Sequence, residues 1–223
     1  MNYGRNKKYF KSTSITPWVI LIIVGLLMLS ANKIVGFIMI LGGAALIFLK
    51  IKGTPTDAEI DAICKSEIEN AVKKGLSKIG IDEEQVQLIE PIVINGPCFE
   101  NIAKEYLTKK GKDGRLRSSN YEFAVLLFSE NQVYSYNYRF SLIENERNEK
   151  TDEYFYKDIV SVSTSSDNVK TKNKKGKEEV FNLEYFRLTT SGGTSISCSV
   201  WDVGGTERSI QGMKQLLREK KSA

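Results

Sequence analysis

Apolar residues dominate one early stretch of the chain. The 35 residues from Ile15 to Leu49 contain only two strongly polar side chains, Asn32 and Lys33. A single straight helix of this length would measure about 52 Å at 1.5 Å per residue, whereas a bilayer core of about 30 Å needs roughly 20 helical residues. The pattern therefore predicts two short transmembrane helices, roughly residues 15–31 and 34–50, joined by a turn at residues 30–33.

The residues that flank this stretch predict its orientation. Four basic residues precede the first helix, two follow the second, and the turn has one. The positive-inside rule then places both ends in the cytoplasm. A cleaved signal peptide is the competing interpretation, but the apolar stretch is too long for one and continues past Ala31. We expect membrane-interface anchors at Lys7, Lys8, Lys11, Trp18, Lys50 and Lys52.

A helical pattern follows the apolar stretch. Thr56 and Glu59 have the spacing of a capping box just after Pro55. Apolar residues then recur at three- and four-residue steps up to Ile79, and Gly80 is a typical helix stop. We predict an amphipathic juxtamembrane helix over 54–80 that packs on the domain after it, with self-association as the alternative.

Beyond Asp82 the period of the apolar positions changes from helical to twofold, which predicts strands. Tight turns are expected at residues 130–131 and 192–193, and residues 101–110 read as partly helical or irregular. A terminal helix opens near residue 204, and its apolar side chains would close the open end of a small β core. The expected strands are residues 90–95, 121–129, 132–142, 153–157, 159–163, 180–190 and 194–200; the stripe of the helix is Ile210, Met213, Leu216 and Leu217.

The strand–hairpin pattern, the segment Tyr156-Lys157-Asp158-Ile159-Val160-Ser161-Val162-Ser163 and the helix after Trp201 resemble bacterial pleckstrin-homology-like domains. The resemblance covers roughly residues 84–220. It departs from that family in a basic insertion at 101–117 and a lysine-rich loop at 170–177. It implies a non-enzymatic module that binds lipids, peptides or proteins, and it transfers no site residue.

Together these patterns predict a membrane-anchored α+β protein. A basic cytoplasmic N-terminus (1–14) leads into a two-helix transmembrane hairpin (15–50) and the juxtamembrane helix (54–80). A mostly antiparallel, pleckstrin-homology-like β sandwich or partly open barrel (84–221) follows, capped by the C-terminal helix.

Composition narrows the chemistry. The chain has no histidine, which removes histidine-based acid–base catalysis, Ser-His-Asp and Cys-His dyads, and histidine-ligated metal sites. Cys64, Cys98 and Cys198 are far apart and odd in number, so they predict small buried side chains in a reducing compartment. We expect no catalytic residue, no metal site, no cofactor and no small-molecule substrate.

Charge points to the membrane instead. Of the net charge of +5, residues 1–52 contribute +7 and residues 53–223 contribute −2. A domain with a net negative charge is poorly suited to binding nucleic acid, which is itself an anion. Two basic loops stand between predicted strands and face either an anionic leaflet or water alone. The candidate anionic-lipid contacts are Lys109, Lys110, Lys112, Arg115 and Arg117 in one loop, and Lys170, Lys172, Lys174, Lys175 and Lys177 in the other.

The sequence thus predicts a non-enzymatic interaction or scaffold protein of the bacterial inner membrane. Its partners would be the lipid bilayer and either a protein or further copies of itself. The expected contact surfaces are the exposed aromatic or apolar face of the sheet and the groove beside the C-terminal helix. One alternative is a membrane effector that oligomerises and perturbs the bilayer, which would be toxic only with residues 15–49 present. The other is an anchored hydrolase using Asp and Glu, which a panel of phosphoester and glycoside substrates would detect.

Overall fold

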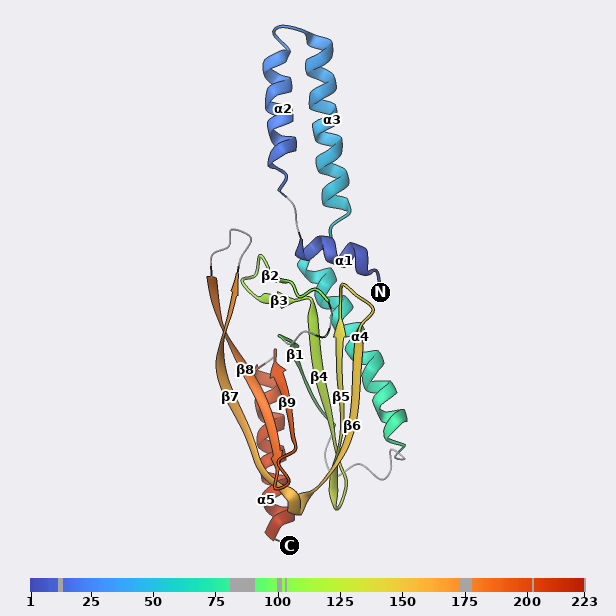
Figure 1. The fold of residues 1–223 in the computed structure, drawn as a ribbon, viewed down its shortest axis with the longest axis vertical. Helices are drawn as coiled ribbons and strands as arrows, with labels where there is room; N and C mark the ends of the chain where they lie inside the picture. Colours follow the sequence, from blue (N-terminus) through green and yellow to red (C-terminus); the bar gives the residue numbers. More distant parts are fainter. Residues whose placement is uncertain are drawn as a thin grey trace. The chain divides into compact units, whose positions relative to one another are not determined.

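A computed structural model describes residues 1–11, 14–80, 91–99, 102, 104–172, 178–201 and 203–222 (Figure 1). The chain divides into two compact units, residues 1–60 and 61–223. Each unit is described by itself. The fold is α+β: helices come first, antiparallel sheets follow, and a helix ends the chain.

The first unit begins with a helix that the sequence patterns did not predict. Helix α1 (Tyr3–Phe10) is capped by Asn2, whose side chain accepts a hydrogen bond from the Arg5 backbone N–H at 3.0 Å. Tyr9 and Phe10 are buried and meet edge to face, with ring centroids 5.0 Å apart. The Tyr9 hydroxyl also donates a hydrogen bond to Asp57 Oδ1 at 2.6 Å. These contacts turn the expected basic tail into an ordered amphipathic helix.

Two apolar helices follow, α2 (Thr16–Met28) and α3 (Lys33–Lys52). Asn32 starts α3 by accepting hydrogen bonds from the backbone N–H groups of Ile34 and Val35 at 3.1 and 3.3 Å. Small residues let the helices pack closely: a Cβ on Gly36 would lie 2.7 Å from the Gly25 carbonyl oxygen. Gly43 also lies close to α2, where an added Cβ would be 2.6 Å from Ile22 Cγ1, whereas Gly42 has nothing within 4 Å.

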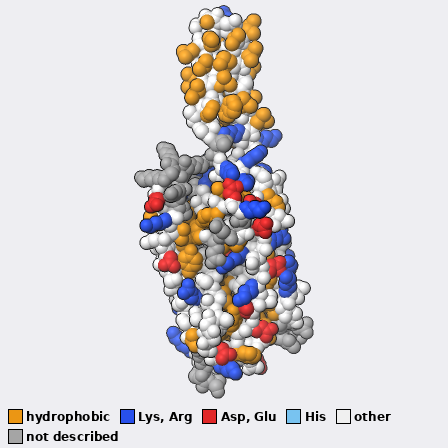
Figure 2. Space-filling model, viewed as in Figure 1, with side chains coloured by type: hydrophobic (Ala, Val, Ile, Leu, Met, Phe, Trp, Pro, Cys, Tyr) orange, Lys and Arg blue, Asp and Glu red, His pale blue; other side chains and the backbone are white. Residues whose placement is uncertain are grey.

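Within the described residues, one helical segment is long and apolar enough to cross a membrane. It runs from Lys33 to Ile79 with a bend between α3 and α4 (Asp57–Ile79). Helix α2 has 13 residues, fewer than the lower limit of about 17 for a spanning helix. The structure therefore shows one membrane-length helix, and the expected pair of spanning helices is not established by it. Large apolar side chains cover the surface of the α2–α3 segment (Figure 2).

Helix α4 begins with the expected capping box. The Thr56 backbone N–H donates to Glu59 Oε2 at 2.8 Å, and the Glu59 N–H donates to Thr56 Oγ1 at 3.2 Å. These reciprocal bonds satisfy two backbone donors that the first helical turn leaves open. Gly80 follows the last turn at φ +67°, a backbone conformation that glycine adopts without steric cost.

The second unit contains two main sheets, in which every strand pair is antiparallel. A 3₁₀ turn (Tyr156–Asp158) connects them. The first sheet has the order β1 (Ile92–Pro97), β4 (Asn120–Phe128), β5 (Gln132–Ser141), β6 (Arg147–Phe155). The second has the order β7 (Ile159–Lys172), β8 (Glu178–Thr190), β9 (Ser195–Val200), and a separate hairpin joins β2 (Thr108–Lys110) to β3 (Leu116–Ser118).

Strand β9 also meets the edge of β1. The Trp201 backbone N–H donates to the Asn95 carbonyl at 2.8 Å, and Ser199 Oγ donates to the Pro97 carbonyl at 2.9 Å. A Cβ on Gly96 would lie 2.5 Å from Ser199 Oγ, so glycine permits the close approach. The two sheets are therefore joined along this side as well as through the 3₁₀ turn.

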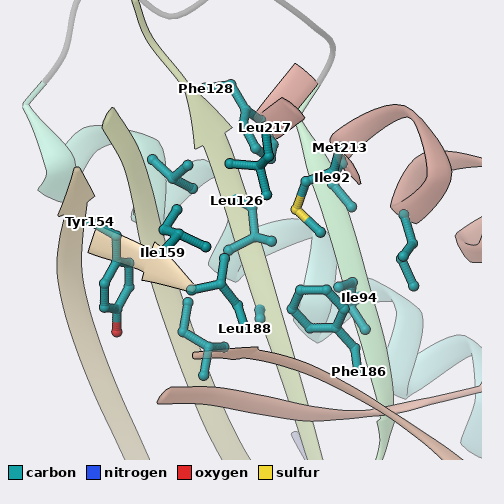
Figure 3. Close-up of a cluster of buried hydrophobic side chains, with 14 of the residues drawn as sticks. Ile92, Ile94, Leu126, Phe128, Tyr154, Ile159, Phe186, Leu188, Met213 and Leu217 are labelled. Carbon is teal, nitrogen blue, oxygen red and sulfur yellow. The ribbon is translucent and has the colours of Figure 1, made fainter. Parts of the chain in front are cut away.

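The hydrophobic core lies between the two sheets and the last helix, α5 (Val203–Ser222) (Figure 3). Phe186 and Leu188 of β8 face Ile94 and Leu126 of the first sheet. The terminal helix contributes the predicted apolar stripe: Ile210, Met213 and Leu217 are buried, and Leu216 packs against them half-buried. The expectation that this helix covers an open end of the β core is confirmed.

The hairpins agree with the sequence prediction, but several strand ends do not. The turn at residues 129–132 is closed by a 3.0 Å bond from the Ser129 N–H to the Gln132 carbonyl, and Gly193 adopts φ +81° in the β8–β9 turn. Strand β6 begins six residues before the expected residue 153, and β7 continues to residue 172. These extensions are largely polar, and backbone pairing holds them without the alternation of apolar residues that a pattern can detect.

The aromatic face of the first sheet is covered, so its expected role as an exposed contact surface is wrong. Tyr136, Tyr138 and Phe140 are buried as a ladder of rings, with Tyr138 and Phe140 centroids 5.6 Å apart. Helix α4 lies over this face, where Gly75 approaches the Tyr136 ring and Glu67 pairs with Arg147 at 3.1 Å. Burial raises the pKa of Tyr138 to about 12. The helix thus packs on its domain as predicted, and the rings belong to the core.

We expect Gly75→Leu to destabilise the second unit. A Cβ on Gly75 would lie 2.5 Å from a Tyr136 ring carbon that the structure holds buried. Overpacking of this kind costs about 1–3 kcal/mol, which exceeds the gain of under about 1 kcal/mol in helix propensity. Chemical denaturation measures the difference. The matched variant Gly212→Leu, on α5 with nothing within 4 Å, should gain stability; an equal response of both variants would contradict the close approach of α4.

Candidate functional site: a basic end and a strand-edge groove

The structure brings the two predicted basic loops together. The ammonium group of Lys110, in the β2–β3 hairpin, lies 5.8 Å from the centroid of the Phe181 ring on β8. In the strand register Phe181 faces Val169, and Lys170 faces Val180. Figure 1 shows the β2–β3 hairpin beside one end of the β7–β8 pair. Side chains about 60 residues apart in sequence therefore share one end of the second unit, which we call the basic end. Its described side chains are Lys109, Lys110, Lys112, Arg115 and Lys170.

Charged and apolar groups are mixed at the basic end. Lys110, Lys112, Arg115 and Lys170 are exposed, and Lys109 is half-buried. Val180, directly across the strand pair from Lys170, is 57% exposed. Lys172 ends β7 instead of lying in a loop, and Lys174, Lys175 and Lys177 lie outside the described residues. The arrangement presents several cations around a small apolar tip.

Arg117 does not belong to this surface, which corrects the sequence prediction. Its side chain is 1% exposed, and its guanidinium is held by two carboxylates. Nε and Nη2 donate to Asp61 at 2.7 Å each, while Nη1 and Nη2 donate to Asp113 at 2.9 and 2.8 Å. Hydrogen bonding from Arg117 holds the pKa of Asp113 well below its ordinary value. This pair of bidentate contacts ties the β2–β3 hairpin to the first turns of α4.

The predicted membrane-interface anchors lie on the helices of the first unit. Lys50 Nζ donates a hydrogen bond to the Ser14 carbonyl at 2.7 Å, and Lys52 Nζ lies 5.9 Å from the Phe48 ring centroid. Trp18 is half-buried near the start of α2. Lys7 and Lys8 are in the last turn of α1, and Lys11 follows it. Their role at a membrane interface stays a prediction.

A groove runs between the beginning of β7 and the outer side of α5. Its volume is about 340 Å³, and it is lined by Ile159, Val160, Ser161 and Val162 from the strand and by Lys214, Leu217 and Arg218 from the helix. Val160 is 57% exposed, while Ile159 and Leu217 are buried at the base. A groove beside the C-terminal helix was predicted from the sequence. Lys214 and Arg218 were not predicted as part of it, although their four-residue spacing places them on one helix face.

A second, more polar cavity of about 170 Å³ lies between the first sheet and β9. The Glu122 carboxylate lines it, accepting a hydrogen bond from the Ser199 N–H at 2.9 Å and pairing with Arg139 at 3.2 Å. Burial raises the pKa of the Cys198 thiol, which disfavours the reactive thiolate. Glu122 thus serves as a buried link between the first sheet and β9.

The described residues contain no group of three or more Cys, Asp or Glu side chains arranged to hold a metal ion. All three cysteines are buried, as the sequence predicted, and none of them forms a disulfide bond. Comparison with known proteins finds no match. No family model, no curated protein and no solved structure is detectably similar to this chain.

Proposed function

We propose that the protein is a membrane-anchored, non-enzymatic interaction protein whose second unit is a pleckstrin-homology-like domain. The observation that carries this proposal is the basic end, assembled from two distant hairpins in a chain that also has a membrane-length apolar helix. In this proposal the domain lies on the cytoplasmic side of a bacterial inner membrane, and its basic end contacts the anionic leaflet.

The arrangement of strands supports the domain assignment. A meander of four antiparallel strands, β1-β4-β5-β6, is followed by a meander of three, β7-β8-β9, and by a helix that covers the core. Seven antiparallel strands followed by a closing helix agree with the sequence pattern on which the resemblance is based, and β2–β3 lies in the predicted basic insertion.

The close packing of α2 and α3 supports a two-helix anchor. Gly25, Gly36 and Gly43 allow the helices to approach, as small residues do between membrane helices. Asn32 caps α3 in the short connection between them, and the basic residues lie mainly outside residues 15–49. We propose that both helices enter the bilayer and that the connection faces away from the cytoplasm.

The free energy of contact between the basic end and an anionic leaflet indicates what these contacts would do in an anchored protein. Each Lys or Arg near an anionic leaflet contributes about 1 kcal/mol, and the effect decays within a Debye length of about 8–10 Å. The anchor already keeps the domain at the membrane, so these contacts would orient the domain. Tethering in turn raises its effective concentration toward membrane-bound partners.

Co-sedimentation with vesicles tests the lipid contact. A fragment of residues 54–223, shown by circular dichroism to unfold cooperatively, is mixed with phosphatidylcholine vesicles with and without phosphatidylglycerol. We expect binding only to the anionic vesicles, weakening with salt. Replacing Lys110, Lys112, Arg115 and Lys170 with alanine should reduce it at least about tenfold.

A matched variant tests whether vesicle binding depends on the charge of the basic end or on the net charge of the whole fragment. It replaces four exposed basic residues elsewhere, Lys65, Lys73, Lys157 and Arg208, with alanine. We expect this variant to keep most of the binding. Equal losses in both variants, or no binding to anionic vesicles, would refute the lipid-contacting role of the basic end.

A further inference from the structure

Strand β7 has one edge that no described residue pairs with. It is an outer strand of its sheet and pairs only with β8 in the described chain. Native proteins protect such edges with lysines, prolines or short strands, because an open edge is a template for another strand. Strand β7 is 14 residues long, and from Ile159 to Asn168 it has no proline and no lysine and a single charge, Asp167. A bulge between Ile159 and Ser161 is the one protective feature here.

The groove beside this edge has the dimensions of an extended peptide. The four lining residues of β7, 159–162, span about 13 Å at roughly 3.3 Å per residue. The volume of about 340 Å³ admits a few residues of backbone with small side chains. Exposed Val160 and the buried base formed by Ile159 and Leu217 offer apolar contacts beside the open backbone edge.

The charge of the groove selects the partner. Lys214 and Arg218 stand one helical turn apart on α5, and no acidic residue is among the seven that line the groove. The groove therefore complements negative charge in whatever strand lies along β7.

We propose that the β7–α5 groove binds an extended acidic segment of a partner protein by adding it as a strand to the free edge of β7, with Lys214 and Arg218 pairing with its carboxylates. Backbone hydrogen bonds supply affinity in this mode, and flanking pockets supply specificity. This inference names a partner class for the proposed interaction role but uses a different surface from the basic end.

A second copy of the chain fits the groove less well. Antiparallel pairing of β7 over its whole length with the same strand of another copy would bring residues 169–172 of that copy opposite residues 159–162. Lys170 would then approach Lys214 and Arg218, and like charges brought together at an interface are unfavourable. Charge thus favours a foreign acidic strand over self-pairing.

Selection from random peptides tests the proposal. The full chain, held in phosphatidylcholine nanodiscs, is used to select from a displayed library of random nonapeptides, with empty discs as the background. We expect the enriched peptides to carry an excess of Asp and Glu and to lack proline at their centres. Neutral lipid offers no anionic headgroup to the basic end, so this selection does not depend on the lipid contact that the vesicle experiment tests. The substitutions at Lys214 and Arg218 described next separate binding in the groove from binding at the basic end.

Fluorescence anisotropy then measures how one enriched peptide binds. The charge reversal Lys214→Glu with Arg218→Glu should weaken binding at least about tenfold. Arg208→Glu, a charge reversal at an exposed position of α5 outside the groove, should leave it within about twofold. Methylating alternate amide nitrogens of the peptide on the edge that faces β7 should abolish binding, because it removes the strand's donors.

Several results would overturn the proposal. They are a library without enrichment over empty discs, enriched peptides that are basic, binding that survives the double charge reversal, and binding that tolerates methylation of every backbone amide in turn. Dimerisation through β7 would also overturn it, because the edge would then bind a second copy of the chain. Cross-linking between Ser163→Cys variants in detergent solution would detect such a dimer.

Discussion

Arg117→Ala should lower the free energy of unfolding of the second unit by about 3–5 kcal/mol. The Arg117 side chain is 1% exposed and makes bidentate contacts with both Asp61 and Asp113. Alanine would leave a cavity and two facing carboxylates without a counter-charge. Denaturation of the fragment 54–223, followed by circular dichroism and by tryptophan fluorescence, measures the loss.

Two further variants test whether the loss of stability in Arg117→Ala comes from the burial of the arginine and its ion pairs. Arg117→Met fills most of the volume without the charge and should cost less than alanine. Lys65→Ala breaks an exposed pair with Glu69 on α4, where such pairs contribute only about 0.3–0.5 kcal/mol. A loss for Arg117→Ala no larger than that of Lys65→Ala would contradict the buried pairing.

The same contact has a pH signature. Arg117 lowers the pKa of Asp113 in the folded protein below its ordinary value, which is about 3.9 in an unfolded chain. A carboxyl with a lowered folded pKa stabilises the protein above the unfolded value and loses that contribution as the pH falls toward the folded one. The stability difference between wild type and Arg117→Ala should therefore be full at pH 7 and shrink below about pH 4.

Removing residues 15–52 should move the protein from the membrane fraction to the soluble fraction. The large apolar side chains on α3 that face outward are 38–74% exposed, an arrangement that water disfavours and hydrocarbon accepts. The full chain should resist extraction by high salt and by carbonate and be released by detergent. Fractionation of cells that express each form checks this.

Point substitutions make the same test without a deletion. Ile38→Arg with Leu41→Arg places two charges at the middle of α3, where each costs about 2.5–3.5 kcal/mol on insertion. We expect these changes to weaken membrane retention, while Ile38→Leu and Leu41→Ile leave it intact. Carbonate-soluble full chain, or membrane retention of the deleted form, would contradict the anchor.

The sequence correctly predicted those elements whose ends are marked by a capping side chain or a turn glycine close by in the chain. Thr56 and Glu59 form the capping box that their spacing predicted, and Gly193 takes the positive φ of its hairpin turn. The stripe of α5 is buried at Ile210, Met213 and Leu217 because a helical period places them on one face. Helix α1 and the β2–β3 hairpin escaped prediction because they are short and mostly polar, and partners elsewhere in the chain stabilise them.

The residues of the candidate sites were also predictable only in part. The basic composition of residues 109–117 and 170–177 was visible in the sequence, but the approach of Lys110 to Phe181 depends on how two hairpins lie in space. Arg117 looked like its neighbours, and its burial is set by Asp61, 56 residues away. The free edge of β7 was not foreseen, since a strand's pattern does not say which neighbours it has.

By itself the sequence determined that the chain has an apolar stretch of membrane length, a capped amphipathic helix and a succession of antiparallel hairpins with a closing helix. Those properties follow from hydrophobic period and turn chemistry, which act between residues close in the chain. Tertiary structure alone decided that the aromatic face lies under α4, that Arg117 is buried between two carboxylates, and that an edge of β7 with which no described strand pairs runs beside two cations. Each of these depends on contacts between distant segments, whose free energy is defined only once the sheets and helices have packed.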